Sequence, residues 1–372
     1  MSHFLIAAGG TGGHMVPAHA VSEELKRRGH QTSLVTDARG AAIPNIFAGD
    51  DKHVIDAASI GGNPLRWIPA LLKIWKGRRQ ASAVVAAHAP VCAVGFGGYP
   101  VLPAMMAALK GSVPTLICEQ NAVLGRVNRL LAKRVDAVAL SFPETERLPD
   151  GADAQVTGNP VRQRIVAIGK RPYPPVDDIC PLRILIMGGS LGASILARVV
   201  PQALARLPEP LKRRLQVVQQ AREEDFEAVC TAYSDAEIPA DVRTYVDDVA
   251  QALADCHLFI GRAGASTISE LTAAGRPGIF VPLPIATDDH QAANTREMVK
   301  AGAAAMIRQQ AFTPENLARQ VTQMLERPET LANAAARANA VGRPDAASRV
   351  ADMAERLAGV GGQPQIHEEN SV

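Results

Sequence analysis

The sequence contains few aromatic residues and no recognisable cysteine pattern. Phe, Trp and Tyr make up 4% of its 372 residues, and its five cysteines are scattered without a Cys-x-x-Cys pair. Such cysteines predict neither a disulfide framework nor a zinc site, so we expect reduced thiols in a cytoplasmic compartment. Few aromatics and a pI of about 8.3 also argue against a partner that is a nucleic acid.

Long apolar runs are missing as well. No stretch of about 18 apolar residues occurs, so we expect no transmembrane helix. The N-terminus leads directly into the strand-like residues 3–8 without a basic lead, which argues against a signal peptide. There is no Asp-x-Asp triplet, and the adjacent carboxylates at 247–248 and 288–289 would point apart on an extended backbone. We therefore expect no divalent metal at a diphosphate site, and no cofactor.

Acidic residues are absent between Asp56 and Glu119. Residues 1–165 carry 18 Lys+Arg against 12 Asp+Glu, whereas the remainder carries 21 against 25. A basic surface on the first half of the chain predicts an anionic partner on that side.

Short apolar runs alternate with helical patterns along the chain, which predicts parallel sheets covered by helices. Both halves begin with a strand, a glycine loop and a helix, as Rossmann units do. We expect strands at 3–8, 32–36, 53–57, 91–96, 114–118, 136–140, 154–157, 182–187, 215–219, 242–246, 257–261, 278–282 and 303–307. We expect helices at 17–28, 100–110, 124–134, 314–326, 329–341 and 345–358.

The predicted fold class is therefore α/β with two Rossmann-like domains. We place the N-terminal domain at 1–165 and the C-terminal domain at 166–345. A helix at 346–358 crosses back to the N-terminal domain, and 359–372 form a polar tail. The proline-dense segment 171–181 is the best linker in the sequence.

Three glycine loops, Gly9–His14, Gly95–Pro100 and Gly188–Ala193, each follow a predicted strand and precede a helix. Glycine lets the backbone approach a diphosphate, and a helix N-terminus offers free N–H groups and the positive end of a dipole. One such loop also serves as a plain tight turn, but three at strand ends predict a phosphate-rich ligand.

The first loop differs from a dinucleotide fingerprint because no acidic residue ends the second strand in a clear register. Asp37 lies near enough to keep a nicotinamide-dependent dehydrogenase open as an alternative. His14 stands at the helix start, where the dipole disfavours imidazolium, so a neutral ring can take a proton from a hydroxyl. The alternative for His14 is a plain helix cap.

Arg262 and a run of small residues follow a later strand and lead into a helix. Arg262, Ser266 and Thr267 are suited to hold phosphate oxygens, and Glu270 to accept hydrogen bonds from a ribose diol. The alternative for Glu270 is a carboxylate that pairs with the helix dipole. The polar cluster at 288–291 opens the next helix on the same side of the sheet.

These motifs, together with Glu119-Gln120-Asn121 and Gly158–Arg162, resemble the MurG family in order and over nearly the whole chain. The resemblance implies a GT-B fold, with two Rossmann-like parallel-sheet domains facing a deep cleft. It also implies an inverting transfer of N-acetylglucosamine from UDP-N-acetylglucosamine to the 4-hydroxyl of the N-acetylmuramoyl unit of undecaprenyl-linked lipid I. The product would be lipid II for peptidoglycan synthesis.

The resemblance also implies roles for single residues. His14 would be the general base, Glu270 would hold the ribose hydroxyls, and the Val246 backbone would meet the uracil. Leu191 stands where the family has glutamine, which leaves no polar side chain there. The donor-binding set, with Arg262 included, is Thr11, Gly12, Gly13, Asn121, Arg162, Ser190, Val246, Arg262, Ala265, Ser266, Thr267, Ile268, Ser269, Glu270 and Gln291. The acceptor-binding set is Gly97, Gly98 and Tyr99.

Residues 64–76 predict an amphipathic helix, in which Arg66 shares a basic stripe with two lysines beside a wide apolar arc. Aromatic and basic residues suit the headgroup layer of an anionic bilayer, so we expect peripheral docking at the cytoplasmic face of the inner membrane. The alternative is a Rossmann helix packed on its sheet. The residues expected at the membrane are Trp67, Lys73, Trp75 and Lys76.

Other functions of the same architecture stay open. One is a GT-B glycosyltransferase with a different lipid acceptor, and another is a non-hydrolysing UDP-N-acetylglucosamine epimerase, which would turn over the sugar nucleotide without an acceptor. If the family's function applies, other cell-wall enzymes are expected partners.

Overall fold

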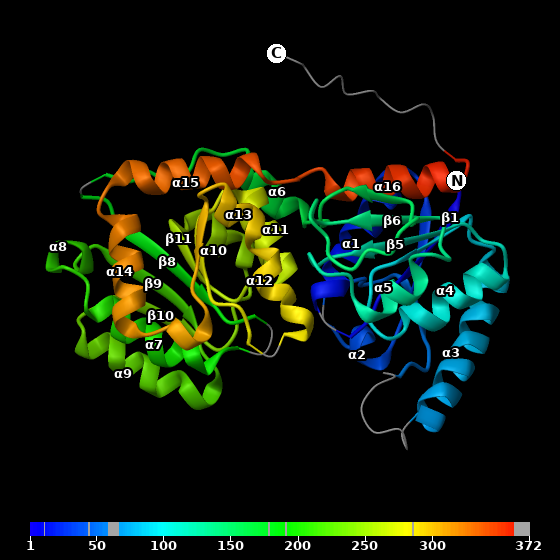
Figure 1. Cartoon of the computed structure of the whole chain (residues 1–372), viewed down its shortest axis with the longest axis horizontal. Coiled ribbons are helices and arrows are strands. Elements are labelled where there is room, and N and C mark those ends of the chain that lie inside the picture. Colours follow the sequence, from blue (N-terminus) through cyan, green and yellow to red (C-terminus); the bar gives the residue numbers. More distant parts are fainter. Residues whose placement is uncertain are drawn as a thin grey trace, which may run out of the picture. The chain divides into compact units, whose positions relative to one another are not determined.

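The structure is a computed structural model in which every sheet is parallel and flanked by helices (Figure 1). The chain divides into two compact units, unit 1 with Met1–Pro160 and Asp345–Val372, and unit 2 with Val161–Pro344. The structure describes residues 1–360 except Thr11, Pro44, residues 59–66, Asp178, Ser190, Leu191 and Ile285, and it gives no side-chain description for Trp67, Thr287 and Pro328.

Unit 1 contains a seven-stranded parallel sheet in the order β3-β2-β1-β4-β5-β6-β7. Its central strands are continuous apolar runs, as expected where a parallel sheet is covered on both faces. In β1, Phe4 and Ile6 face one core, and Leu5 and Ala7 face the other. The strands are β1 (His3–Ala7), β2 (Gln31–Thr36), β3 (Asp51–Val54), β4 (Cys92–Gly95), β5 (Thr115–Glu119), β6 (Ala137–Leu140) and β7 (Ala154–Val156).

Helices cover both faces of this sheet. α1 and α16 supply side chains to the core with Phe4, and α3, α4 and α5 supply the core with Leu5. The C-terminal helix α16 therefore completes unit 1, although it follows all of unit 2 in the sequence. The helices are α1 (Gly12–Arg27), α2 (Ala38–Ala41), α3 (Trp67–His88), α4 (Val101–Lys110), α5 (Arg126–Leu131) and α16 (Ala346–Leu357).

Unit 2 contains a six-stranded parallel sheet in the order β10-β9-β8-β11-β12-β13. Counted within the unit, this is the order 3-2-1-4-5-6 of a dinucleotide-binding Rossmann sheet. The strands are β8 (Leu182–Met187), β9 (Leu215–Gln220), β10 (Ala240–Arg243), β11 (Leu258–Gly261), β12 (Gly278–Phe280) and β13 (Ala304–Met306).

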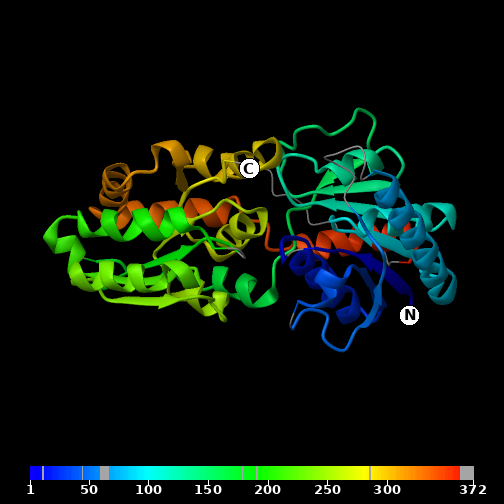
Figure 2. The ribbon, with the colours of Figure 1, turned by 90° about the horizontal axis from the view of Figure 1, so that it is seen from below.

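The helices of unit 2 also lie on both sides of its sheet (Figures 1 and 2). Ile184 and Ile186 of β8 face a core shared with α7, α9 and α14, whereas α10 packs on β8 beside α6 and α11. The helices are α6 (Gln163–Gly169), α7 (Ser194–Ala205), α8 (Glu209–Lys212), α9 (Phe226–Asp235), α10 (Val249–Asp255), α11 (Ala265–Ala274), α12 (His290–Asn294), α13 (Arg296–Lys300), α14 (Pro314–Leu325) and α15 (Pro328–Ala340). The described residues of unit 2 also form the short 3₁₀ turns η2 (Glu223–Asp225), η3 (Thr287–Asp289) and η4 (Gln309–Ala311).

Each predicted strand corresponds to an observed one, with ends that differ by at most three residues. The first predicted helix, 17–28, begins earlier, at Gly12, because Pro17 lies inside the helix and does not open it. From Trp67 onward the predicted helix at 64–76 is observed as α3, which continues to His88 because Ala81 and Val85 extend its buried face. Residues 64–66 of that prediction lie outside the described residues.

The division between the units falls at Pro160 and Val161, ahead of the predicted boundary at 165. The proline-dense segment 171–181 lies within unit 2. Tyr173 packs against the unit 2 core and donates a hydrogen bond to the carbonyl of His257 at 2.6 Å. The packing of this partly buried tyrosine explains why the segment is not the linker.

None of the helices in the described part of the chain is both long and apolar enough to cross a membrane. The five cysteines are free, and Cys92, Cys118 and Cys256 are buried.

Candidate active site

In both sheets the strand order reverses beside the first strand of the unit. In unit 1 the first two glycine loops follow β1 and β4, and in unit 2 the third loop and Arg262 follow β8 and β11. Open α/β sheets bind ligands at this switch point, beyond the carboxyl ends of the strands. The fold therefore places the predicted motifs of each unit where such sheets bind ligands.

The first two glycine loops lie against each other in unit 1. A Cβ added to Gly98 would lie 2.5 Å from the carbonyl oxygen of Gly9, and a Cβ on Gly97 would lie 2.9 Å from the His14 ring. Both residues have positive φ, 91° at Gly97 and 85° at Gly98. Glycine is therefore required at both positions, by the close approach as well as by the backbone conformation.

The His14 ring is held by Gln120. Its Nδ1 lies 3.0 Å from Gln120 Oε1, and the Gln120 amide nitrogen donates to the Cys118 carbonyl at 3.1 Å. This second bond fixes which end of the amide faces the ring, so Nδ1 carries the proton and donates it to the amide oxygen. Nε2 is then the nitrogen that is free to accept a proton.

One buried and one partly buried carboxylate shape the surrounding loops. Glu119 accepts hydrogen bonds from the backbone N–H of Asn121 at 3.0 Å and of Gly125 at 2.8 Å, and so holds the loop with Asn121. Asp37 accepts from the N–H of Gly10 at 3.1 Å and of Gly40 at 2.9 Å. Asp37 thus stabilises the first glycine loop, and this structural role accounts for its position after β2 without a ribose contact.

The electrostatics of Asp37 agree with this structural role. Burial opposes its ionisation, yet the N–H of Gly40, the side chain of Arg39 and the N–H of Gly10 together hold the pKa of Asp37 below its ordinary value. The Arg39 guanidinium also lies 5.8 Å from the centre of the Tyr99 ring, which is 41% exposed at the end of the second loop. Tyr99 is therefore presented to solvent beside the His14 loop.

In unit 2, α11 begins directly after β11 with Gly264 as its N-cap. Glycine has no side chain to cap the helix, so first-turn amides such as those of Ala265 and Thr267 can donate to a ligand at this end. The next amide, of Ile268, already donates to the Gly264 carbonyl at 3.0 Å. The Ser269 hydroxyl donates back to the Ala265 carbonyl at 2.9 Å, so it belongs to the helix.

Arg162 and Glu270 form an ion pair within unit 2. Arg162 Nη2 and Nε lie 2.7 and 3.1 Å from Glu270 Oε1, and no described residue donates to Oε2. The Glu270 side chain is 13% exposed. Burial raises the pKa of the Glu270 carboxyl, although the Arg162 guanidinium acts in the opposite direction. The two residues were predicted separately as donor contacts, and the fold brings them together.

The Arg262 guanidinium is hydrogen-bonded within unit 2. Its Nη1 donates to the carbonyls of Val281 at 2.9 Å and Pro282 at 3.2 Å, and its Nη2 donates to Gln309 at 2.8 Å. These carbonyls follow the end of β12, where the ladder leaves them without partners, and the guanidinium satisfies them. Burial lowers the pKa of Arg262.

Gln291 and Val246 are two further predicted donor residues of unit 2. Gln291 accepts from the Leu283 N–H at 2.9 Å. Val246 is 3% exposed in the segment that leads to α10. Asp248 caps α10 and pairs with Arg164 at 2.7 Å, which joins α10 to α6. Thr11, Ser190 and Leu191 lie outside the described residues.

The outer face of α3 is apolar and exposed. Ile68 is 71% exposed, Leu71 53%, Leu72 62% and Trp75 53%, whereas Ala70 and Ile74 are buried on the inner face. The helix therefore packs on unit 1 and keeps a second apolar face. Lys73 is exposed, Lys76 pairs with Asp56 at 2.8 Å, and Arg79 lies 4.9 Å from the Trp75 ring centre. The Trp67 side chain is outside the description.

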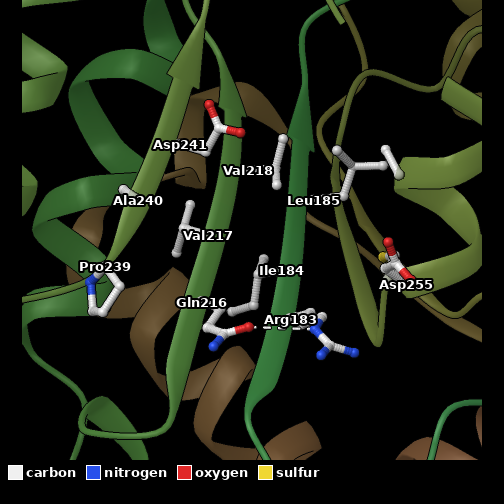
Figure 3. Close-up of a pocket in the computed structure, with 12 residues that line it drawn as sticks. Arg183, Ile184, Leu185, Gln216, Val217, Val218, Pro239, Ala240, Asp241 and Asp255 are labelled. Carbon is white, nitrogen blue, oxygen red and sulfur yellow. Dashed lines mark hydrogen bonds between the residues drawn. The ribbon is translucent and has the colours of Figure 1, made fainter. Parts of the chain in front are cut away.

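Unit 2 also contains a cavity of about 520 Å³ that is not lined by the third glycine loop or by α11 (Figure 3). Its walls come from the first and middle residues of β8 and β9, from β10 and from α10, and Arg183 bonds to Gln216 across its floor at 3.3 Å. None of the predicted site residues lines it, so we do not assign the donor to this cavity.

Gln120 is the functional residue that sequence reasoning left without a role. Its place in the Glu119-Gln120-Asn121 motif, just after a predicted strand, was the available signal, and the structure shows that it is buried after β5. Its partner His14 lies 106 positions away in the sequence, so only the fold reveals the pair.

Comparison with known proteins agrees with this geometry. Residues 4–140 match the glycosyltransferase family 28 N-terminal domain, and residues 183–357 match the glycosyltransferase family 28 C-terminal domain. The chain belongs to glycosyltransferase family 28.

Within that family, the chain is 54% identical over 359 residues to the UDP-N-acetylglucosamine–N-acetylmuramyl-(pentapeptide) pyrophosphoryl-undecaprenol N-acetylglucosamine transferase of Erythrobacter litoralis, with 96% of this chain and 90% of that protein covered. The crystal structure of Acinetobacter baumannii MurG is similar, with a TM-score of 0.78, 33% identity, and 96% and 100% of the two chains covered. The predicted MurG-family membership and two-domain Rossmann-like fold are confirmed.

A UDP-GlcNAc 2-epimerase from Neisseria meningitidis, bound to UDP-GlcNAc, has a TM-score of 0.67 at 14% identity, with 94% of this chain and 98% of that chain covered. At this identity the likeness concerns the fold alone.

Proposed function

We propose that this glycosyltransferase moves N-acetylglucosamine from UDP-N-acetylglucosamine to the N-acetylmuramoyl 4-hydroxyl of lipid I. The acceptor is the undecaprenyl-linked N-acetylmuramyl-(pentapeptide) pyrophosphate, and the products are lipid II and UDP. The name of the relative from Erythrobacter litoralis supports both substrates. The observation that carries the proposal is the uncapped first turn of α11 at the switch point of unit 2, beside the pair of Arg162 and Glu270.

Unit 2 is proposed to bind the donor. The diphosphate accepts hydrogen bonds from the first-turn amides of α11, where the helix dipole favours negative charge. Glu270 Oε2 accepts hydrogen bonds from the ribose diol while Oε1 stays on Arg162. The Val246 backbone meets the uracil edge. The remaining proposed donor contacts are Thr11, Gly12, Gly13, Asn121, Ser190, Arg262, Ser266, Thr267, Ile268, Ser269 and Gln291.

His14 of unit 1 is proposed as the general base, with Gly97, Gly98 and Tyr99 contacting the acceptor. Nε2 takes the proton of the muramoyl 4-hydroxyl as that oxygen attacks the anomeric carbon of the donor. The bond from the anomeric carbon to the β-phosphate oxygen breaks, and UDP leaves with the electron pair. Attack opposite the leaving group inverts the anomeric configuration. Gln120 supports this role because it keeps the proton on Nδ1.

The enzyme is proposed to work as a peripheral protein at the cytoplasmic face of the inner membrane, where an undecaprenyl-linked acceptor resides. The exposed apolar face of α3, with the cations Lys73 and Arg79 beside it, supports contact with an anionic lipid surface. Other cell-wall enzymes are proposed partners at that surface.

The test is transfer of labelled N-acetylglucosamine from UDP to a synthetic lipid I analogue. We expect a labelled disaccharide product and one UDP per transfer, with and without a chelator, because amides and side chains hold the diphosphate. A labelled product with a different lipid acceptor but none with lipid I would disprove the proposed acceptor.

The same assay without acceptor tests the epimerase alternative, which the fold alone permits. We expect UDP-N-acetylglucosamine to stay intact in that arm. Formation of the epimeric sugar or free UDP without acceptor would favour the alternative.

A further inference from the structure

Three histidines and one aspartate gather in unit 1, away from the glycine loops. Asp51 Oδ2 lies 3.2 Å from His53 Nε2 and 3.3 Å from His88 Nε2. The His88 ring stacks on His3 at 4.9 Å and meets the His53 ring edge-on at 4.9 Å. Asp51 and His53 belong to β3, and His88 is the last residue of α3.

This cluster is distant from the proposed chemistry. His3 is the first residue of β1, and the first glycine loop follows the last residue, Ala7. Four steps of a strand at about 3.3 Å each separate the two ends by roughly 13 Å. Neither the proposed donor site nor His14 uses any of these side chains.

We propose that Asp51, His53 and His88 bind a divalent transition-metal ion of the zinc type. Two imidazole nitrogens and one carboxylate oxygen form an established zinc ligand set, and three protein ligands leave a fourth position for water. With bonds of about 2.0–2.1 Å, tetrahedral ligand atoms lie about 3.3–3.5 Å apart. The two separations from Asp51 Oδ2, 3.2 and 3.3 Å, are close to this spacing.

The three proposed ligand side chains are accessible to an ion and lie close to one another. All three ligand atoms lie within 4.8 Å of one another, so the two imidazoles need only a side-chain rotation to reach one ion. The side chains are 51% exposed at Asp51, 26% at His53 and 27% at His88. An ion can therefore enter from solvent and still be held by partly buried imidazoles.

A second group of possible metal ligands differs from the proposed site in its charge; it consists of His19, Glu23 and Asp50. Here the Lys26 ammonium pairs with both carboxylates, so a cation of the protein already occupies the place of a metal. At the proposed site Lys52 turns instead to the Ile46 carbonyl. Among the described residues, only His53 and His88 pair with Asp51. Its negative charge is therefore available to an ion.

The ion would join the C-terminal end of α3 to β3, since the ligands come from these two elements. Metal binding to the folded chain stabilises the segments that supply the ligands. The consequence would be local: the last turn of α3 and β3 should exchange their amide hydrogens more slowly with the ion, whereas α11 of unit 2 should be unaffected.

The test uses the full chain, produced without a polyhistidine tag and stripped with a chelator, then titrated with Zn²⁺ against a competing indicator. We expect one Zn²⁺ per chain. Asp51→Asn, His53→Ala and His88→Ala should each weaken binding at least about 100-fold, because even changes behind the ligands cost about 10–100-fold. His19→Ala is the matched control and should bind as the wild type does.

Hydrogen exchange with and without Zn²⁺ provides the local readout in the same proteins. Asp51→Asn keeps the side-chain shape at a half-exposed position, so its folding is not in question. The proposal would be overturned if the wild-type chain did not bind Zn²⁺, or if the three ligand variants bound Zn²⁺ as tightly as the wild type. Protection of α11 in place of β3 and the end of α3 would overturn it too.

Discussion

His14 Nδ1 and Gln120 Oε1 lie 3.0 Å apart, and the amide nitrogen of Gln120 is bound to the Cys118 carbonyl. A glutamine amide offers either a donor or an acceptor, and the bond to Cys118 removes that choice. The imidazole is thereby fixed as the tautomer whose Nε2 accepts a proton. Replacing either side chain therefore tests a chemical role and a positioning role separately.

His14→Ala should lower kcat by about 100- to 10,000-fold, the usual contribution of a general base, with little change in KM for the donor. Gln120→Leu should lower kcat by about 10-fold, since one hydrogen bond of about 1.4 kcal/mol no longer fixes the ring. Nitrogen NMR of labelled wild-type protein should show the His14 proton on Nδ1. A proton on Nε2 of the wild type would contradict both assignments.

Gly97→Ala should also reduce turnover, because the new methyl group would lie 2.9 Å from the His14 ring and displace it. The φ of 91° at Gly97 adds strain of about 1–2 kcal/mol for any L-residue. Gly29→Ala is a matched control, with φ of 86° and no atom within 4 Å of the added Cβ. Steady-state kinetics should show a loss of kcat in Gly97→Ala but not in Gly29→Ala. Equal activity of the two variants would argue against contact between the second glycine loop and His14.

The strands and loops could be predicted from the sequence because their signals are local. Leu182–Met187 is apolar except for the exposed Arg183 and ends in a glycine loop, which in an α/β chain indicates a buried parallel strand. The length of α3 was harder to predict from the sequence, because Arg78 and Arg79 interrupt the apolar pattern while Ala81 and Val85 continue the buried face.

The pairings within the site could not be predicted in the same way. Arg162 and Glu270 are 108 positions apart, and nothing in either segment points to the other. Arg262 follows a strand just as a phosphate-binding residue would, yet the free carbonyls of Val281 and Pro282 bind its guanidinium. Such contacts depend on tertiary structure, whereas residue type and spacing report only which groups are present.

Removing the exposed apolar side chains of α3 should weaken attachment to anionic vesicles. Leu72 and Trp75 are 62% and 53% exposed, and losing about 1 kcal/mol of burial at each corresponds to about a fivefold loss of binding per residue. Leu72→Ser and Trp75→Ser should therefore sediment less with vesicles, and Lys73→Glu should act in the same direction. Ile179→Ser, an 86% exposed position of unit 2, is the control, and an equal loss there would contradict docking through α3.

The ion pair of Arg162 and Glu270 should leave a pH-dependent signature in stability. Because burial raises the pKa of Glu270, the folded chain holds this proton more tightly than the unfolded chain. The free energy of unfolding therefore falls as the pH rises above the ordinary value of 4.5. Arg162→Ala removes the cation and raises that pKa further, so its deficit relative to the wild type should grow with pH.

Because the Arg162 side chain is 40% exposed, solvent screening limits the expected deficit to about 1–2 kcal/mol at neutral pH. Urea unfolding of wild type and variant at about pH 5 and about pH 8 measures it. Arg162→Lys keeps a cation and should lose less. In Arg162→Ala combined with Glu270→Gln there is no carboxylate to ionise, so the growth of the deficit with pH should disappear. A deficit of Arg162→Ala that is equal at both pH values would mean that the guanidinium stabilises unit 2 by packing and not by charge.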